Sequence, residues 1–522
     1  LYIMSVEEQI QLSYINTTNS GINMIVSWIR FNGSQPIHFH ELSMNKYNTY
    51  YPTIGFLILL FSTLGGFIGF NICCTSKENH KIIPGPNGNT KKYNVNHWKI
   101  YKKKYGDCFV FSGLFCYMLV LFAIVSSGFL FPKHKVIDYT ADEFVKICSI
   151  NHYEEIGCNI NRATVKILKT TGYMRLLFNS EMNNLMPGTE YSYEFGSIER
   201  GWSKKYSFNT MKSLVGTNAE KLSLAVYGDF GFANSQSLEK LIDFQTRGLY
   251  DAVLHVGDMA YNLDTDNGVI GDNFMNKIQP FASKVPYMTC PGNHESADNF
   301  TQYRLRYNMP GAQSGSGNNL YYSFDIGDIH FVAISSELYY YSNYYNNDNL
   351  KRQYDWLLND LALSNKRGSK WKVVYAHRPM YCSVDTNDGN SICTSDTEIL
   401  RDGTTYNGGN RVAPLEAVLY NYNVDFFFAG HMHSYERLWP TYREQVLQKN
   451  YYKPRGPIHI IAGSAGCNEN LDTYDKKTYP WSAYKSDSYG FGMLDFYNNS
   501  VARWRQIKAR DGSTLDEIYV TK

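Results

Sequence analysis

Hydrophobic and polar residues alternate in the first part of the chain. Over residues 5–36 this pattern predicts two β-strands with one buried face. The apolar positions there are Ile22, Met24, Val26 and Trp28. The alternation returns over residues 173–210, where Tyr191 follows a Pro-Gly turn, an arrangement typical of the tyrosine corner of Greek-key sandwiches. These patterns therefore predict that residues 1–40 and 166–212 form the two ends of one fibronectin-III-like β-sandwich.

From residue 220 onward, short continuous apolar runs alternate with helical patterns. The runs predict strands at 222–227, 252–256, 287–290, 330–334, 372–376, 424–429 and 458–462. Residues 237–247 and 350–363 have the periodicity of helices that bury one face. This order predicts an α/β domain over residues 220–437, with 438–522 as the C-terminal part of the same fold. The whole chain is thus of the α+β class.

A long insertion separates the two halves of the sandwich, at residues 41–165. It contains two uncharged stretches, 51–74 and 108–132, each long enough to cross a bilayer. The loop between them carries eight lysines against Glu78 and Asp107, which by the positive-inside tendency places that loop in the cytosol. A membrane insertion and a retained intron or gene-model error both remain open. Two buried core helices fit less well, because neither stretch has a polar face.

Charge and composition narrow the function classes. With 50 basic and 48 acidic residues the net charge is +2, so no nucleic-acid partner is expected. Four N-glycosylation sequons suggest a secreted or lumenal protein, anchored in the membrane with a lumenal catalytic domain if the insertion is real. They lie at Asn16, Asn32, Asn299 and Asn498. No complete signal peptide is visible after Leu1, which leaves open a missing leader or a start at Met4.

The ten cysteines are too few for a dense disulfide framework in a chain of 522 residues. Cys382 and Cys393 lie close together in a polar loop and are candidates for one disulfide. Cys290 is expected to be a small buried thiol.

Five short blocks place oxygen and nitrogen donors directly after the apolar runs of the second domain. They are Gly-Asp-Phe-Gly at 228–231, Gly-Asp-Met-Ala-Tyr at 257–261, Gly-Asn-His-Glu at 292–295, His377, and Gly-His-Met-His at 430–433. A single Gly-Asp after a strand is usually a turn, but the whole ordered set is not explained by turns. Carboxylate oxygens beside imidazoles are the donors that two adjacent metal ions of mixed character require.

The ordered blocks resemble those of the calcineurin-like metallophosphoesterases, whose catalytic domain is an α/β sandwich. Most members of that superfamily have Asp-x-His in the first block and Gly-Asp-x-x-Asp in the second. This chain lacks the first-block histidine and has Tyr261 in the second block, an exchange that resembles the purple acid phosphatases. The resemblance covers residues 215–522, and the blocks after His377 and Gly430 are most similar to the long animal and protist forms.

The resemblance implies a dinuclear centre of Fe(III) and a divalent ion, which is Fe, Zn or Mn. The implied ferric ligands are Asp229, Asp258, Tyr261 and His433. The implied divalent ligands are Asp258, Asn293, His377 and His431, with Asp258 bridging. The implied activity is that of an acid phosphatase, in which a metal-bound hydroxide attacks a small phosphomonoester. His294 is the candidate to protonate the leaving group or orient the phosphate, with a packing role as its alternative, and Glu295 is expected to support its neighbours rather than react.

Several interpretations stay open at the level of sequence. Plant members carry further histidines after the His377 block, whereas this chain has none between 378 and 430, and Arg378 is either a substitute charge or a structural ion pair. Residues 463–467 suit a phosphate loop or a sharp turn, and the tyrosine-rich segment 339–345 suits a surface loop or a substrate platform. Alternative functions are a phosphodiesterase or nucleotide pyrophosphatase, or a membrane-anchored binding protein with a vestigial site. Physiological substrate and oligomeric state are not indicated.

Overall fold

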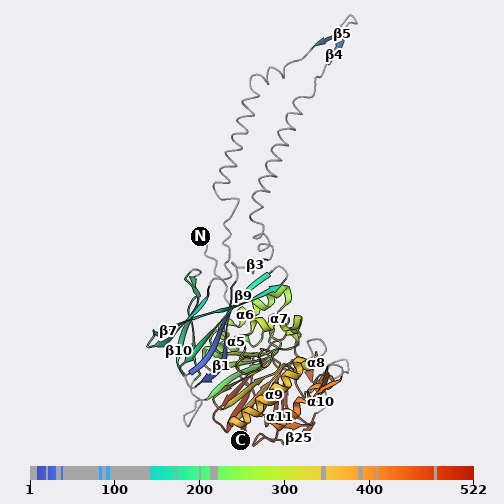
Figure 1. Ribbon diagram of the computed structural model, residues 1–522. Helices are drawn as coiled ribbons and strands as arrows, with labels where there is room; N and C mark the ends of the chain where they lie inside the picture. Colours follow the sequence, from blue (N-terminus) through green and yellow to red (C-terminus); the bar gives the residue numbers. More distant parts are fainter. Residues whose placement is uncertain are drawn as a thin grey trace. The chain divides into compact units, whose positions relative to one another are not determined.

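The computed structural model describes most of the chain outside the insertion (Figure 1). The described residues are 9–18, 21–30, 37–38, 81–84, 90–93, 142–170, 173–198, 201–211, 221–341, 348–385, 392–406, 409–474 and 479–522. The chain divides into one unit made of residues 1–40 and 142–522, and a second unit made of residues 41–141.

In the second unit the described residues form a hairpin of β4 (Lys81–Pro84) and β5 (Thr90–Tyr93). The two apolar stretches 51–74 and 108–132 lie outside the described residues. Among the helices that are described, none combines the length and apolar character needed to cross a membrane.

The N-terminal part of the first unit consists of two five-stranded sheets. One sheet contains β1 (Gln9–Thr18), β2 (Gly21–Arg30), β9 (Tyr173–Leu185), β3 (Ile37–His38) and β8 (Thr164–Thr170). The other contains β11 (Gly201–Trp202), β10 (Glu190–Ser197), β6 (Phe144–Asn151), β7 (Glu154–Arg162) and β12 (Tyr206–Asn209). The two strands expected over residues 5–36 are thus confirmed as β1 and β2.

Aromatic side chains fill the space between these two sheets. Trp28 of β2 lies 5.5 Å from the ring of Phe178 in its own sheet and 4.8 Å from Phe195 in the other. Such interdigitation from two inner faces is the packing of a β-sandwich. The hydroxyl of Tyr191 accepts a hydrogen bond of 2.8 Å from the backbone N–H of Met186, which is the tyrosine-corner contact that the sequence suggests.

The insertion is shorter than the sequence predicts. Residues 142–165 were expected to belong to it, but β6 pairs with β10 and β7 pairs with β6, so the sandwich resumes at residue 142. The error has a physical cause in β7, where most side chains are exposed, including Ile156 and Ile160. A strand without a buried face has no alternating pattern by which to recognise it.

The C-terminal part of the first unit holds two larger mixed sheets. The six-stranded sheet has the order β15 (Tyr287–Cys290), β14 (Ala252–Val256), β13 (Leu222–Tyr227), β29 (Gly490–Phe496), β30 (Val501–Lys508), β31 (Thr514–Thr521). The seven-stranded sheet has the order β16 (Tyr322–Ile326), β17 (Ile329–Ala333), β18 (Trp371–Tyr375), β22 (Phe426–Ala429), β26 (Ile458–Ala462), β23 (Tyr435–Leu438), β28 (Ser482–Ser486). Neighbouring strands from β13 to β15 and from β17 through β18 and β22 to β26 run parallel.

Buried aromatic residues join the two sheets face to face. Phe496 of β29 lies 5.4 Å from Trp371 of β18, and Trp504 of β30 lies 5.1 Å from Phe428 of β22. Every residue of β13, β14, β15, β18, β22 and β26 is buried. Strands covered on both faces read as continuous apolar runs, which is why the sequence places them to within one or two residues.

Helices cover the outer faces of both sheets (Figure 1). On the six-stranded sheet, Phe244 of α5 packs 5.3 Å from Phe491 of β29. On the seven-stranded sheet, Asp360 of α9 accepts hydrogen bonds from Ser323 and His330. The α-helices in the described part of this domain are α5 (Leu238–Thr246), α6 (Val269–Ala282), α7 (Ala297–Arg306), α8 (Glu337–Tyr340), α9 (Asp348–Arg367), α10 (Ile392–Asp402) and α11 (Leu415–Asn421).

A buried ionic cluster joins the sandwich to the larger domain. Asp272 of α6 pairs with Arg175 of β9 at 2.7 Å and with Arg306 of α7 at 2.8 Å, and all three side chains are buried. The hydroxyl of Tyr193 also donates to the carbonyl of Ser283, at 2.7 Å. Because an unpaired charge in such a place is strongly destabilising, this cluster fixes α6 and the loop that precedes it against the sandwich.

Candidate metal centre

The five sequence blocks meet at the carboxyl ends of the parallel strands. The first two run side by side, since Asp229 N–H donates to the Gly257 carbonyl at 3.1 Å and Gly231 N–H donates to Met259 at 2.8 Å. The N–H of Gly430 donates to the carbonyl of His377 at 2.8 Å. Segments up to about two hundred residues apart, from both larger sheets, therefore meet at the carboxyl ends of their strands, which is where α/β sheets place their sites.

Two glycines of the blocks are required because a carboxylate lies against them. A Cβ atom at Gly292 would stand 2.2 Å from Asp258 Oδ1, and one at Gly430 would stand 2.3 Å from Asp229 Oδ2. Asp229 and Asp258 themselves have positive φ values, 54° and 50°. Left-handed backbone at non-glycine residues is concentrated at functional sites, and here it turns both carboxylates inward.

One group of donors surrounds Asp258. Its Oδ2 lies 3.1 Å from His377 Nε2, and the same nitrogen is 3.0 Å from Asn293 Oδ1. Donor atoms of Asp258, His377 and His431 all lie within 4.8 Å of one another. The structure thus brings together all four residues that the sequence assigns to the divalent site.

A second group surrounds Asp229. The hydroxyl of Tyr261 lies 2.7 Å from His433 Nε2, which is 3.5 Å from Asp229 Oδ1. That carboxylate oxygen is buried and accepts no hydrogen bond within the described part of the chain. A buried carboxylate oxygen without a hydrogen-bond partner is costly unless a cation contacts it.

Two of the imidazoles are oriented by backbone carbonyls. Nδ1 of His377 donates to Val256 O at 3.0 Å, and Nδ1 of His433 donates to Asn470 O at 3.1 Å. With Nδ1 protonated by these contacts, Nε2 of each ring faces the carboxylates as a ligand nitrogen. Such outer hydrogen bonds fix the tautomer and the ring orientation of metal-binding histidines.

The histidines and carboxylates of the site strongly shift one another's pKa values. Burial alone would lower the pKa of His377, but the charge and hydrogen bond of Asp258 raise it to about 10. Burial would also lower the pKa of His433, but its interactions with Asp229 and Cys467 outweigh burial and raise that pKa to about 12. Burial would raise the pKa of Asp258, but the charge of His377 holds the pKa of Asp258 below its usual range. Cations binding here must displace protons from these histidines, so their affinity rises with pH.

The donor set suits two adjacent cations. Carboxylate, amide and phenol oxygens together with imidazole nitrogens fit iron, zinc or manganese. Burial raises the pKa of the Tyr261 phenol, and the charges of Asp229 and Asp258 raise it further.

His294 lies at the open side of the site. Its Nδ1 donates to Asn262 Oδ1 at 2.9 Å, its ring lies 4.5 Å from that of Tyr261, and its Nε2 is 3.9 Å from Asp258 Oδ2. Glu295 is buried and accepts the N–H groups of Asp258, Met259 and Gly292 at 2.9, 3.0 and 2.9 Å. Burial and the charge of Asp258 raise the pKa of Glu295 to about 8. Glu295 holds the backbone of the second and third blocks together, as expected.

Arg378 is both an ion pair and a neighbour of the site. Its Nε donates to the two carboxylate oxygens of Glu337 at 3.0 and 3.1 Å, and its guanidinium carbon lies 4.3 Å from the Tyr340 ring centre. Its Nη1 is 3.0 Å from His431 Nε2. Tyr340 belongs to the tyrosine-rich segment 339–345, of which residues 342–345 lie outside the described residues.

The segment after β26 is a turn that reaches the site. The N–H groups of Gly463 and Cys467 donate to Ser434 and Phe230, at 3.1 and 3.3 Å, and so are not available to a phosphate. The sequence alternative of a sharp turn fits these contacts. Beyond it, Glu469 has carboxylate oxygens 3.8 Å from His294 Nε2 and 4.0 Å from His433 Nε2.

Sequence reasoning missed four residues that touch the site. They are Asn262, Glu337, Glu469 and Asp472, the last of which accepts the N–H of His433 at 2.6 Å. The polar run after the strand at 458–462 was the available signal for Glu469 and Asp472, because every other ligand-bearing block follows a strand in the same way. Glu337 follows the strand predicted at 330–334 after Ser335 and Ser336, so the same signal was available there.

The remaining sequence candidates fall outside the centre. Cys382 and Cys393 form the expected disulfide, and Cys290 is a buried free thiol. Asn299 and Asn498 are exposed. Asn16 lies in β1 but its side chain is outside the described residues, as is Asn32 altogether.

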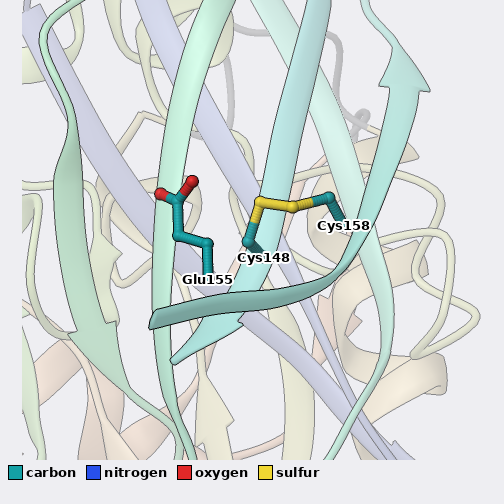
Figure 2. A group of neighbouring side chains, drawn as sticks. All are labelled: Cys148, Glu155 and Cys158. Carbon is teal, nitrogen blue, oxygen red and sulfur yellow. A yellow bond between two sulfur atoms is a disulfide. The ribbon is translucent and has the colours of Figure 1, made fainter. Parts of the chain in front are cut away.

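A second cluster of donor types, in the sandwich, is not a metal site. Cys148, Glu155 and Cys158 lie together, but the two sulfur atoms are bonded to each other (Figure 2). Glu155 accepts a hydrogen bond of 2.6 Å from Ser192 and pairs with Lys205 at 2.9 Å. These partners account for the whole cluster.

Comparison with known proteins places the chain in a family. Residues 222–435 match the family model described as calcineurin-like phosphoesterase, and residues 456–517 match the iron/zinc purple acid phosphatase-like protein C-terminal model. The mouse (Mus musculus) acid phosphatase type 7 is 40% identical over 349 residues, covering 65% of this chain and 76% of that protein.

Plant proteins are similar over a comparable range. Purple acid phosphatase 21 of Arabidopsis thaliana is 30% identical over 401 residues, covering 74% of this chain and 81% of that protein. A solved purple acid phosphatase from yellow lupin (Lupinus luteus) seeds shares the fold, with a TM-score of 0.59 at 22% identity over 73% of this chain and 69% of that one. The chain is thus a phosphoric monoester hydrolase of the purple acid phosphatase family, which implies a dinuclear centre that contains iron.

Proposed function

We propose that the chain hydrolyses small phosphomonoesters at acidic pH with one ferric and one divalent ion. The observation that carries this proposal is the meeting of seven donor residues, Asp258 and Asp229 among them, where the parallel strands of the two larger sheets end. The proposed ferric ligands are Asp229, Asp258, Tyr261 and His433, and the proposed divalent ligands are Asp258, Asn293, His377 and His431. The divalent ion is Fe, Zn or Mn, since the donors suit all three.

Two cations held by these residues would supply the charge that neutralises a phosphate and activates water at low pH. The protein groups do the remaining work. The second and third blocks keep Asp258 fixed through Glu295, while His377 and His433 are fixed by their carbonyl contacts. His294 lies beside both donor groups without belonging to either set of proposed ligands, and from there its Nε2–H can donate to the leaving oxygen.

Replacing His294 with Asn should separate the acid role from a packing role. We expect the rate to fall about 10²-fold or more for an alkyl phosphate, whose leaving oxygen needs the proton. The loss should be much smaller for p-nitrophenyl phosphate, whose leaving group is stable as an anion. Steady-state kcat values on the two substrates measure this, with metal content as the control. Equal losses on both substrates would assign His294 to orienting or packing instead.

The reaction class is tested by two esters assayed in parallel. At pH 5, p-nitrophenyl phosphate should be hydrolysed faster than bis-(p-nitrophenyl) phosphate, and chelation should abolish the activity because the ions supply the electrostatic stabilisation. A preference for the diester would favour a phosphodiesterase or nucleotide pyrophosphatase. A protein inactive on both, with intact fold, would favour a binding role.

We also propose that the N-terminal sandwich is fibronectin-III-like and that the catalytic part lies in the secretory pathway. Two disulfides, Cys148–Cys158 and Cys382–Cys393, are typical of oxidising compartments. Exposed sequons at Asn299 and Asn498 agree with that location. Anchoring through residues 51–132 would add a membrane attachment with the catalytic part on the lumenal side.

A further inference from the structure

The hydrogen bond between Arg378 and His431 uses a lone pair that a metal ligand needs. A guanidinium only donates, so His431 Nε2, 3.0 Å from Arg378 Nη1, is the acceptor. A neutral imidazole has one ring lone pair, because its other nitrogen carries the proton. While Arg378 holds that lone pair, His431 has none to offer a cation. The Arg378–His431 bond and coordination by His431 therefore exclude each other.

Arg378 would keep its place when this bond is exchanged. Its Nε is held by both oxygens of Glu337, a carboxylate with no exposed surface, and Tyr340 lies over its guanidinium. Its backbone N–H donates to Ser336 Oγ at 3.0 Å. These contacts anchor the head group independently of His431. Once a cation takes the His431 lone pair, Nη1 remains beside the divalent site as a fixed, positively charged donor.

A phosphate at the centre would bring oxygen acceptors beside Nη1. The planar, positively charged fork of arginine matches phosphate oxygens. We propose that Arg378 is a substrate-binding residue, exchanged from His431 to a phosphate oxygen as the divalent site fills. This inference rests on the proposed function. Arg378 would thus supply a positive charge at the site in a chain that has no histidine between residues 378 and 430.

The test is the binding of inorganic phosphate to the metal-loaded protein. For Arg378→Met, isothermal titration calorimetry should show phosphate affinity about 10- to 100-fold weaker, the range for a hydrogen bond to a charged group. Affinity for the divalent ion, measured by chelator competition, should be unchanged or tighter, because nothing competes for the His431 lone pair. Iron content should stay the same.

Three further variants separate charge, geometry and folding. Arg378→Lys keeps the charge but cannot reach Glu337 and His431 together, so phosphate affinity should lie between those of Arg378→Met and the unchanged protein. The double variant Glu337→Gln with Arg378→Met removes both charges and should lose as much phosphate affinity as Arg378→Met. Arg175→Met is the matched control, since Asp272 keeps Arg306 as a partner. It should bind phosphate normally.

Two results would overturn the proposal. One is that Arg378→Met, with both metals bound, has a phosphate affinity within about twofold of that of the unchanged protein. If Arg378→Met does not fold, the same phosphate affinity in Arg378→Lys overturns the proposal. The other is loss of the divalent ion with normal phosphate affinity per loaded site, which would make Arg378 a positioning residue for His431. Calorimetry needs no turnover, so a protein that binds phosphate through Arg378 yet hydrolyses no monoester would contradict the proposed function alone.

Discussion

Replacing Asp258 with Asn should remove both metals and lower the phosphatase rate by about 10³-fold or more, since metal-ion stabilisation contributes several kcal/mol. Asp258 lies 3.1 Å from His377 and is the carboxylate proposed as a ligand of both ions. A neutral amide keeps the shape but loses the charge that holds two cations together. Metal analysis by mass spectrometry and initial rates on p-nitrophenyl phosphate measure the two effects.

The fold should survive this change because the backbone contacts of Asp258 are separate from its carboxylate. Its N–H is held by Glu295 at 2.9 Å whether residue 258 is acidic or not. Asp243→Asn, the same chemical change at a half-buried residue of α5 that pairs with Arg247, is the control and should leave metals and rate unaltered. Two metals and a rate within tenfold of the unchanged protein in Asp258→Asn would refute the shared-carboxylate assignment.

Replacing Tyr261 with Phe should bleach or shift the visible charge-transfer absorption, which requires a phenolate bound to Fe(III). Burial, Asp229 and Asp258 together raise the pKa of Tyr261, so the protein alone keeps this phenol protonated. A ferric ion at its oxygen acts in the opposite direction and deprotonates it. The colour therefore reports the bond between this one residue and iron. Absorption spectroscopy with iron analysis on the same sample measures it.

A second buried tyrosine provides the comparison for this spectrum. Tyr227 ends the strand before the first block, and its hydroxyl contacts Tyr287 at 3.2 Å rather than the donor groups. Tyr227→Phe should leave the band in place. A Tyr261→Phe protein that keeps its iron and an unaltered band would show that Tyr261 is not a ligand, whatever the activity.

Much of the catalytic domain could be read from the sequence because its central strands are covered on both faces. β13, β14, β15 and β26 have the bounds that their apolar runs predict. The blocks that follow parallel neighbours within each sheet end on the same side, and Gly292 and Gly430 admit the carboxylates of the neighbouring blocks. Local pattern and tertiary arrangement agree at these positions.

Other features depend on contacts that no local pattern encodes. Glu337 opens a four-residue helix and becomes relevant only because Arg378 reaches it from a different strand end. Glu469 is exposed and lies near His294 through a turn whose path the sequence leaves open. Strand β7 exposes most of its side chains, so neither its existence nor its disulfide to β6 could be inferred from hydrophobic alternation.

Metal analysis of the purified full chain tests the central claim most directly. We expect two metal ions per chain, at least one of them iron, together with chelator-sensitive hydrolysis of p-nitrophenyl phosphate at pH 5. The iron should be accompanied by visible absorption that disappears in Tyr261→Phe. A folded protein that contains no iron, or that hydrolyses the monoester equally well after all metal is removed, would contradict an iron-containing dinuclear phosphatase.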